Sequence, residues 1–346
     1  MRPKAYLAYR FSALATLLLV SALALSACGT SDSPGESAAQ ASIRDQSNPQ
    51  GRILTANQGA NSVTLIDVAT DTAYGTVSTG QQPHHVVGTP DGKEFWVTLY
   101  KENRLQVFDT KTLKEVVSVD VGASNDDITF EPSGKRVFVS LGGADAVAVV
   151  DTAGKKLLQT VKVGKTPHGI KVTPDGKLLL VTNTADNTVS VLSLGDSVAV
   201  QGTVRTGNNP FEVAISDDSA TAYISNFLGD SITVIDLKAS KAVGTIRAGK
   251  QPAMVAFSQS NGKQLIAVAN TGSSDLWLID PATKKLVTRV PVGAGAHGVV
   301  LTASGKLYVT NSTDNTVSVI DGATDKVLQT IAVANNPNGL TFMPPQ

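Results

Sequence analysis

The residues of this chain that are best suited to chemistry fall at equivalent points of a repeated segment. Each copy places two variable positions directly before a short apolar run, and all four histidines of the 346-residue sequence occupy such positions. Histidine and carboxylate side chains bind zinc, copper and other divalent metals, and they also serve in recognition and catalysis. The candidate ligand-binding positions are His84, His85, Asp126, Asp127, His168, Phe211, Glu212, His297 and Asn338.

The repeat that carries these positions is clearest at Lys306–Pro337, which reads KLYVTNSTDNTVSVIDGATDKVLQTIAVANNP. Its three apolar runs are rich in Val, Ile, Thr and Tyr and alternate with period two, which predicts strands. The Asn, Asp, Ser and Gly residues between the runs tolerate tight turns. A fourth short run follows at Gly339–Met343. One unit therefore predicts a four-stranded antiparallel meander.

The spacing of the units predicts a propeller. Turns of the Asp-Gly-Lys kind precede the same strand in most copies and lie 42 or 43 residues apart. Four-stranded units of this length are typical of propeller blades, whereas solenoid repeats carry helices or are shorter. Six complete blades are expected near residues 84–121, 126–163, 168–206, 211–248, 253–292 and 297–333.

The ends of the repeat array predict how the ring closes. The array begins with the strand Arg52–Asn57, which lacks an innermost strand before it, and ends with an innermost strand at Gly339–Met343. Residues 52–79 and 339–343 would together form one blade and leave no open sheet edge. We therefore expect an all-β fold, a seven-bladed β-propeller closed by a 3+1 composite blade. A monomer is expected because such a ring needs no partner to cover an edge.

One strand of the unit carries a family resemblance. It reads YVTN in the clearest copy and recurs as variants such as Leu54–Asn57, Tyr223–Asn226 and Tyr308–Asn311. These residues resemble the YVTN family of β-propeller repeat proteins, over Arg52 to Met343. The resemblance implies seven blades around a central channel. It implies little about activity, because that family is functionally mixed and a fold does not fix a function.

Comparison of the copies separates scaffold from candidate site. The YVTN Asn, the Asn or Asp four residues later and the Asp that ends the following strand recur in most blades, so we assign them to turns. The loop that enters the innermost strand varies instead, and loops at a channel mouth are where ligands usually bind. Of its residues, His84, Asp126, His168 and His297 are the candidate ligands of a divalent metal. The alternative is that Pro-His-Gly is an ordinary variant of this loop.

Other motifs and the charge exclude several classes of protein. The segment Gly293–Gly298 matches GxGxxG but joins two strands, without the helix that a dinucleotide site requires. Removing three basic residues with the N-terminal leader leaves a net charge of −3, since the whole chain holds 29 basic and 29 acidic residues. Nucleic acid is therefore an unfavoured partner. Four aromatic residues, Trp96, Tyr100, Phe211 and Phe227, could stack on single-stranded DNA if a basic track lay beside them, but the basic candidates are scattered and packing is the favoured role of these aromatics.

The N-terminal residues predict export and lipidation. A basic start, the apolar run Phe11–Leu25 and the sequence Leu-Ser-Ala before Cys28 resemble a bacterial lipoprotein signal, so residues 1–27 are assigned to the signal peptide. Residues 28–51 are then the lipidated Cys28 and a Ser, Ala and Gly-rich tether, and residues 52–346 the propeller. Gly29 favours the outer membrane or the cell surface, with the periplasmic side as the alternative. With Cys28 as the sole cysteine, the propeller contains no disulfide.

Three functions are consistent with these features. The leading one is a membrane-tethered scaffold that binds a small molecule or a protein at the channel mouth, since no motif of a catalytic nucleophile is present. The second is a metal carrier or metal-dependent enzyme that uses the mouth histidines. The third, binding of single-stranded DNA, is disfavoured by the charge.

Overall fold

The computed structural model describes residues 50–122, 124–260 and 263–345, which belong to the compact unit that begins at Ile43. These residues form 28 β-strands and no helix. The described part of the chain accordingly offers no helix able to span a membrane. The expected signal peptide, Cys28 and most of the expected tether lie outside the described residues.

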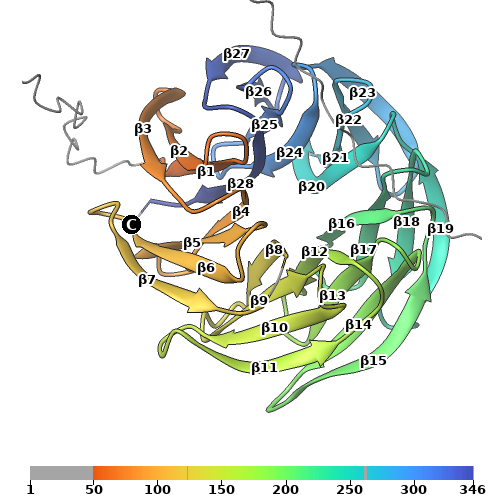
Figure 1. The fold of residues 1–346 in the computed structure, drawn as a ribbon. Coiled ribbons are helices and arrows are strands. Elements are labelled where there is room, and N and C mark those ends of the chain that lie inside the picture. Colours follow the sequence, from red (N-terminus) through yellow and green to blue (C-terminus); the bar gives the residue numbers. More distant parts are fainter. Residues whose placement is uncertain (1–49, 123, 261–262, 346) are drawn as a thin grey trace, which may run out of the picture. The chain divides into compact units, whose positions relative to one another are not determined.

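The strands form seven four-stranded antiparallel sheets, arranged as blades around a centre (Figure 1). Blade 1 contains β4 (Pro83–Gly88), β5 (Glu94–Leu99), β6 (Arg104–Asp109) and β7 (Glu115–Asp120). Blade 2 contains β8 (Asn125–Phe130), β9 (Arg136–Leu141), β10 (Ala146–Asp151) and β11 (Lys156–Lys162). Blade 3 contains β12 (Pro167–Val172), β13 (Leu178–Asn183), β14 (Thr188–Leu194) and β15 (Val198–Arg205).

The remaining blades repeat this order from the innermost strand outward. Blade 4 contains β16 (Pro210–Ile215), β17 (Thr221–Asn226), β18 (Ser231–Asp236) and β19 (Lys241–Arg247). Blade 5 contains β20 (Pro252–Ser260), β21 (Lys263–Asn270), β22 (Asp275–Asp280) and β23 (Lys285–Pro291). Blade 6 contains β24 (Ala296–Leu301), β25 (Lys306–Asn311), β26 (Thr316–Asp321) and β27 (Lys326–Ala332). Blade 7 contains β28 (Pro337–Met343), β1 (Arg52–Asn57), β2 (Ser62–Asp67) and β3 (Thr72–Ser78).

Blade 7 confirms the 3+1 closure. The C-terminal strand β28 pairs with β1 in antiparallel register, with Arg52 opposite Met343 and Thr55 opposite Leu340. The expected blade boundaries agree with the observed ones to within about one residue, apart from the last strand, which begins at Pro337 rather than at Gly339. A polar contact also ties the composite blade to blade 6, because Asp71 accepts hydrogen bonds from the Tyr308 hydroxyl and from Lys306 Nζ (2.6 Å).

The hydrophobic core lies between neighbouring blades. Seven clusters of buried residues each combine side chains of two adjacent sheets; in one of them, Trp96 and Leu105 of blade 1 contact Val137 and Val139 of blade 2. The middle strands are buried on both faces, which is why they read as near-continuous Val, Ile and Leu runs. Each outermost strand is mostly exposed. The innermost strands are thereby held rigidly around the channel.

A repeated hydroxyl group fixes the residues at the channel mouth. In blade 1, Thr98 Oγ1 accepts the amide N–H of His85 (2.9 Å) and donates to the carbonyl of Asp126 in blade 2 (2.8 Å). Ser140, Ser225 and Thr310 make the same pair of contacts in other blades. In these four blades the hydroxyl at the Thr position of the YVTN strand therefore connects a mouth loop to the next blade.

The Asn and Asp residues assigned to local turns divide into two groups. Those that end the third strand do form such turns; Asp67 Oδ1 accepts the amides of Ala69 (2.7 Å) and Thr70 (3.1 Å). The Asn or Asp that stands four positions after the YVTN Asn instead bonds to the next blade. Asn61 Oδ1, for example, accepts the amide of Gln82 (2.9 Å). Gln82 has a left-handed φ of 54°, as do its counterparts in the other mouth loops, Ser124, Thr166, Asn209, Gln251, Gly295 and Asn336. The assignment to scaffold is confirmed, but part of its geometry lies between blades.

Candidate functional site

The first variable position of each innermost strand forms one ring around the channel, which we call the mouth ring. Its members are His84, Asp126, His168, Phe211, Ala253, His297 and Asn338. The structure brings three of the four expected metal ligands together. His84, Asp126 and His168, from three consecutive blades, each offer one ligand atom, and these atoms lie within 4.8 Å of one another.

Backbone carbonyls orient both histidines of this cluster. His84 Nδ1 lies 3.1 Å from the carbonyl oxygen of Asp126, and His168 Nδ1 lies 3.2 Å from that of Phe211. A carbonyl only accepts hydrogen bonds, so each Nδ1 must carry the proton and each Nε2 keeps a free lone pair. The two rings lie edge to face, with centroids 5.2 Å apart.

Burial favours the uncharged form of each group in the cluster. Burial, reinforced by neighbouring histidines, lowers the pKa of His84 to about 4 and that of His168 to about 3. Asp126 is 5% exposed, and burial together with the neighbouring Asp127 raises its pKa to about 8, although the Gly142 amide hydrogen-bonds to it. At neutral pH the imidazoles are therefore neutral bases, and ionisation of the carboxyl is unfavourable without a positive charge nearby.

Aromatic side chains border the cluster on one side. The Phe211 ring lies 3.9 Å from the His168 ring and 5.2 Å from Phe227, and Tyr100 lies 6.1 Å from His84. Phe211 and the residues beside it therefore line the mouth, whereas Trp96 is fully buried in the core between blades 1 and 2. These rings contact one another within the protein, and none of the contacts indicates stacking on a nucleic-acid base.

His297 and Asn338 lie in the mouth ring but outside the metal-ligand cluster. The His297 ring contacts Phe211 edge to face at 5.7 Å, and its buried Nδ1 has no hydrogen-bond partner among the described residues. Burial, with His84 and His85 nearby, lowers the pKa of His297 to about 3. The Asn338 amide donates to Gln58 Oε1 (3.2 Å), which turns it toward the scaffold.

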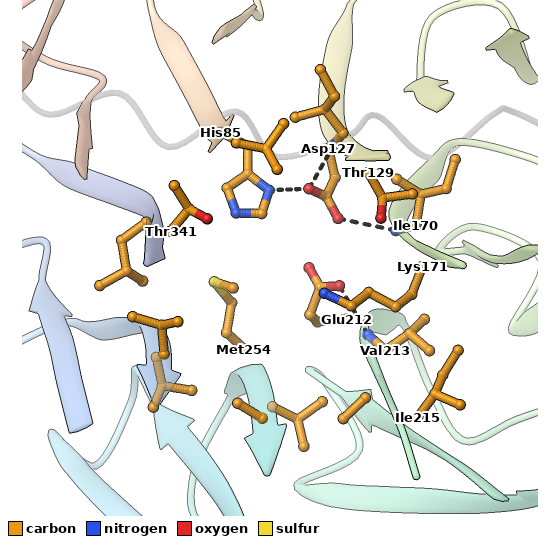
Figure 2. A pocket seen from close by; sticks show the side chains of 18 of the residues that line it. His85, Asp127, Thr129, Ile170, Lys171, Glu212, Val213, Ile215, Met254 and Thr341 are labelled. Atoms are coloured by element: carbon orange, nitrogen blue, oxygen red, sulfur yellow. Dashed lines mark hydrogen bonds and ion pairs between the residues drawn. The ribbon is translucent and has the colours of Figure 1, made fainter. Parts of the chain in front are cut away.

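In four blades the second variable position, occupied by His85, Asp127, Glu212 or Met254, lines a channel cavity of about 210 Å³. Figure 2 shows His85, Asp127 and Glu212 around this space. His85 Nδ1 pairs with the Asp127 carboxylate, which also accepts the amides of Ile128 (2.7 Å) and Ile170 (3.0 Å). The sequence had placed these residues at the mouth itself, and the structure moves them one layer inward.

The two buried carboxyl groups of the cavity differ in protonation. Burial opposes ionisation of Asp127, but His85 and the two amides outweigh it and hold the pKa of Asp127 below its ordinary value. Burial and the Asp127 charge raise the pKa of Glu212 well above its ordinary value, and Lys171 only partly offsets this. Asp127 is therefore ionised at pH 7, whereas ionisation of the neighbouring Glu212 is disfavoured.

The cavity lining departs strongly from seven-fold symmetry. Its charged and titratable groups all come from blades 1 to 4, whereas blades 5 to 7 contribute mostly apolar side chains such as Met254 and Val300. Lys171 also lines this cavity (Figure 2), although the sequence analysis did not identify it. Comparison of the copies three residues after each mouth position would have found it, because those residues are Val87, Thr129, Lys171, Ala214, Ala256, Val300 and Thr341.

Comparisons with known proteins agree with this fold. A family model described as a seven-bladed β-propeller lactonase matches residues 44–199, and a model described as a YNCE-like β-propeller matches residues 170–305. Among curated proteins, a PE-PGRS family protein of Mycobacterium tuberculosis is 46% identical over 48 residues, which are 14% of this chain and 10% of that relative. The match thus spans only a tenth of the length of that relative.

Solved structures match nearly the whole propeller. A functionally unknown protein from Desulfotomaculum acetoxidans has a TM-score of 0.74 at 16% identity and covers 86% of this chain and 100% of its own. A 6-phosphogluconolactonase, described as putative, from Bacteroides fragilis has a TM-score of 0.72 at 16% identity, with 86% and 99% covered. The periplasmic gluconolactonase of Pseudomonas aeruginosa has a TM-score of 0.70 at 18% identity, with the same coverage. The chain is thus an all-β, seven-bladed β-propeller with lactonase-like neighbours in fold.

Proposed function

We propose that this protein is a membrane-tethered, extracytoplasmic propeller that binds a small, oxygen-rich molecule through its channel mouth. The observation that carries the proposal is the asymmetric cavity of about 210 Å³ below the mouth ring. A scaffold with near seven-fold symmetry has no structural need to gather its charged groups on one side. The cavity is smaller than the roughly 300–1,000 Å³ of drug-sized pockets, so its ligand is small.

The lining suggests the class of ligand. Lys171 offers a positive charge and up to three hydrogen-bond donors, and the apolar wall opposite it suits the less polar face of a ring. A sugar acid or its lactone matches both features. The names of the lactonase-like neighbours point to the same class of compound.

The binding experiment uses the intact lipoprotein in detergent, titrated calorimetrically with D-gluconate. Lys171→Met removes the cavity charge, and Lys177→Met serves as the matched control because Lys177 lies in an exposed turn. Loss of a charged hydrogen bond costs about 1.5–3 kcal/mol, so we expect Kd to rise about tenfold or more in Lys171→Met and to stay unchanged in Lys177→Met. Equal affinities in the two variants, or no saturable binding to the wild type, would refute the proposal.

Lactone hydrolysis is the second candidate function, and the lactonase family model over residues 44–199 favours it. It is measured as acid release from glucono-1,5-lactone, with the spontaneous reaction subtracted. Turnover by the wild type that Glu212→Gln abolishes would establish an enzyme in place of a binding scaffold. A rate equal to the spontaneous one excludes it.

The tether defines where binding takes place. Lipid on Cys28 would anchor the chain, and residues 28–51 would let the propeller stand away from the membrane by roughly 25 Å on average. Incorporation of a labelled fatty acid into the wild type, and its absence from Cys28→Ala, tests this part of the proposal.

A further inference from the structure

We propose that His84, Asp126 and His168 bind one divalent transition-metal ion, of the zinc or copper kind, at the channel mouth. The ligand set contains two imidazoles and one carboxylate whose ligand atoms lie within 4.8 Å of one another. Around a metal with bonds of about 2.0–2.2 Å, ligand atoms lie roughly 3.3–3.5 Å apart. Small rotations of the side chains are enough to reach that spacing.

The histidines are held in the orientation that a metal requires. Metal-binding histidines usually donate their second ring N–H to a carbonyl or carboxylate, which fixes the tautomer and the ring plane. His84 and His168 do this toward the carbonyls of Asp126 and Phe211. Those carbonyls also accept hydrogen bonds from the hydroxyls of Thr98 (2.8 Å) and Thr182 (3.0 Å). The scaffold therefore supports the ligands through two successive layers of contacts.

The carboxyl group of the buried Asp126 also has no competing cationic side chain beside it, since among the described residues it forms no ion pair with a lysine or arginine. A buried carboxylate is unfavourable unless a positive charge offsets it, and a divalent ion supplies that charge at the centre of the cluster. Calcium and magnesium prefer all-oxygen sites, whereas imidazole nitrogens favour zinc, copper and nickel.

Three protein ligands leave a coordination position open. Zinc sites with three protein ligands commonly complete their shell with water or an exogenous ligand. His297 was expected from the sequence as a further ligand, but it lies outside the cluster, against the far edge of Phe211. We therefore assign no direct metal bond to His297. Its replacement serves as a control, because His297 is also a histidine of the mouth ring.

The test uses the full-length protein, purified in detergent without a histidine tag and treated with EDTA. It is titrated separately with Zn²⁺ and with Cu²⁺ by calorimetry, and the metal content after growth in metal-supplemented medium is determined by elemental analysis. The wild type is expected to bind one equivalent. His84→Ala, Asp126→Asn and His168→Ala should each weaken binding by about 10–100-fold or more, the range found even for groups that only support ligands. His297→Ala should change it less than about threefold.

Several outcomes would overturn the proposal. Less than about a tenth of an equivalent in the wild type shows that the cluster holds no metal. Equal losses in His297→Ala and His168→Ala show that the ligand set is wrong. Asp126→Asn preserves the shape of the side chain and is therefore expected to fold. Thermal melts of the metal-free variants show whether each one is folded, which separates the loss of a ligand from misfolding. Titration of the metal-free wild type with D-gluconate reports on the cavity independently.

Discussion

Replacing Asp126 by Asn should make the metal-free protein more stable at neutral pH. Burial, followed by the charge of Asp127, raises the pKa of Asp126 from 3.8 to about 8 in the folded chain. Between these values the folded protein binds a proton that the unfolded chain does not, so the free energy of unfolding falls as the pH rises. Asparagine has nearly the same shape and does not titrate, so the variant lacks this loss.

The size of the effect follows from the pKa shift. Each pH unit between the two pKa values changes the free energy of unfolding by 1.36 kcal/mol. The side chain is 5% exposed, so solvent screening is slight. From pH 4 to pH 7, about three units, the wild type should lose about 4 kcal/mol relative to Asp126→Asn. Below pH 3.8 the difference should be constant, because the carboxyl is then protonated in both states.

Urea unfolding of both proteins in EDTA, at pH 4, 5, 6 and 7, measures this difference. Other titrating groups are shared by the two proteins and largely cancel in the comparison. Added Zn²⁺ at 100 times the wild-type Kd should then stabilise the wild type by about 2.7 kcal/mol and Asp126→Asn, whose binding is about 10–100-fold weaker, by only about 0.4–1.4 kcal/mol. A pH-independent difference, or a variant that becomes relatively less stable toward pH 7, would show that the carboxylate is already compensated.

Three further predictions concern the scaffold and the anchor. Thr98→Val removes the hydroxyl that joins two mouth loops, so it should cost about 1–3 kcal/mol in urea unfolding, and no loss would contradict the role assigned to it. Tyr308→Phe removes a hydrogen bond to Asp71 between blades 6 and 7 and should cost about 1.5–3 kcal/mol, with an unchanged midpoint of unfolding as the contrary result. Cys28→Ala should shift the protein from the membrane to the soluble fraction in cell fractionation, and persistent membrane association would exclude the lipid as the anchor.

The fold could be predicted from the sequence because its signals are repeated and local. Strand patterns and turn residues recur in every unit, and the incomplete units at the two ends indicate the composite blade. The apolar run in Lys306–Asn311, for instance, belongs to a strand that is buried at all but its first residue, and the equivalent strands of other blades are buried in the same way. Seven copies of one pattern reduce the ambiguity that a single short strand would leave.

The contacts between blades could not be predicted in the same way. The letters alone do not show that Asn61 bonds the next blade while Asp67 bonds its own turn, because both are acidic or amide residues beside turns. The hydroxyl of Thr98 likewise gains its role only when the neighbouring mouth loop lies against it. These contacts depend on how adjacent sheets pack.

The mouth ring was identified from the sequence, and so were three of the groups that meet within it, but the sequence did not separate them from His297. Seven positions around an axis can be assigned from the register of the repeats, whereas the direction of each side chain depends on the local loop. His84, Asp126 and His168 converge because they lie on consecutive blades, and His297 stays apart beyond Phe211. The innermost strands that carry His85 and Lys171 shift register after their first residue, and the sequence does not report which of their side chains then line the cavity.

The most direct test of the account is an anomalous difference map, recorded at the zinc absorption edge from crystals of the zinc-loaded protein. A zinc ion bound by the three proposed ligands predicts one strong peak at the channel mouth, about 2.0–2.2 Å from Nε2 of His84, a carboxylate oxygen of Asp126 and Nε2 of His168. A map without a peak at the mouth, or with zinc bonded to His297 in place of His168, would contradict it.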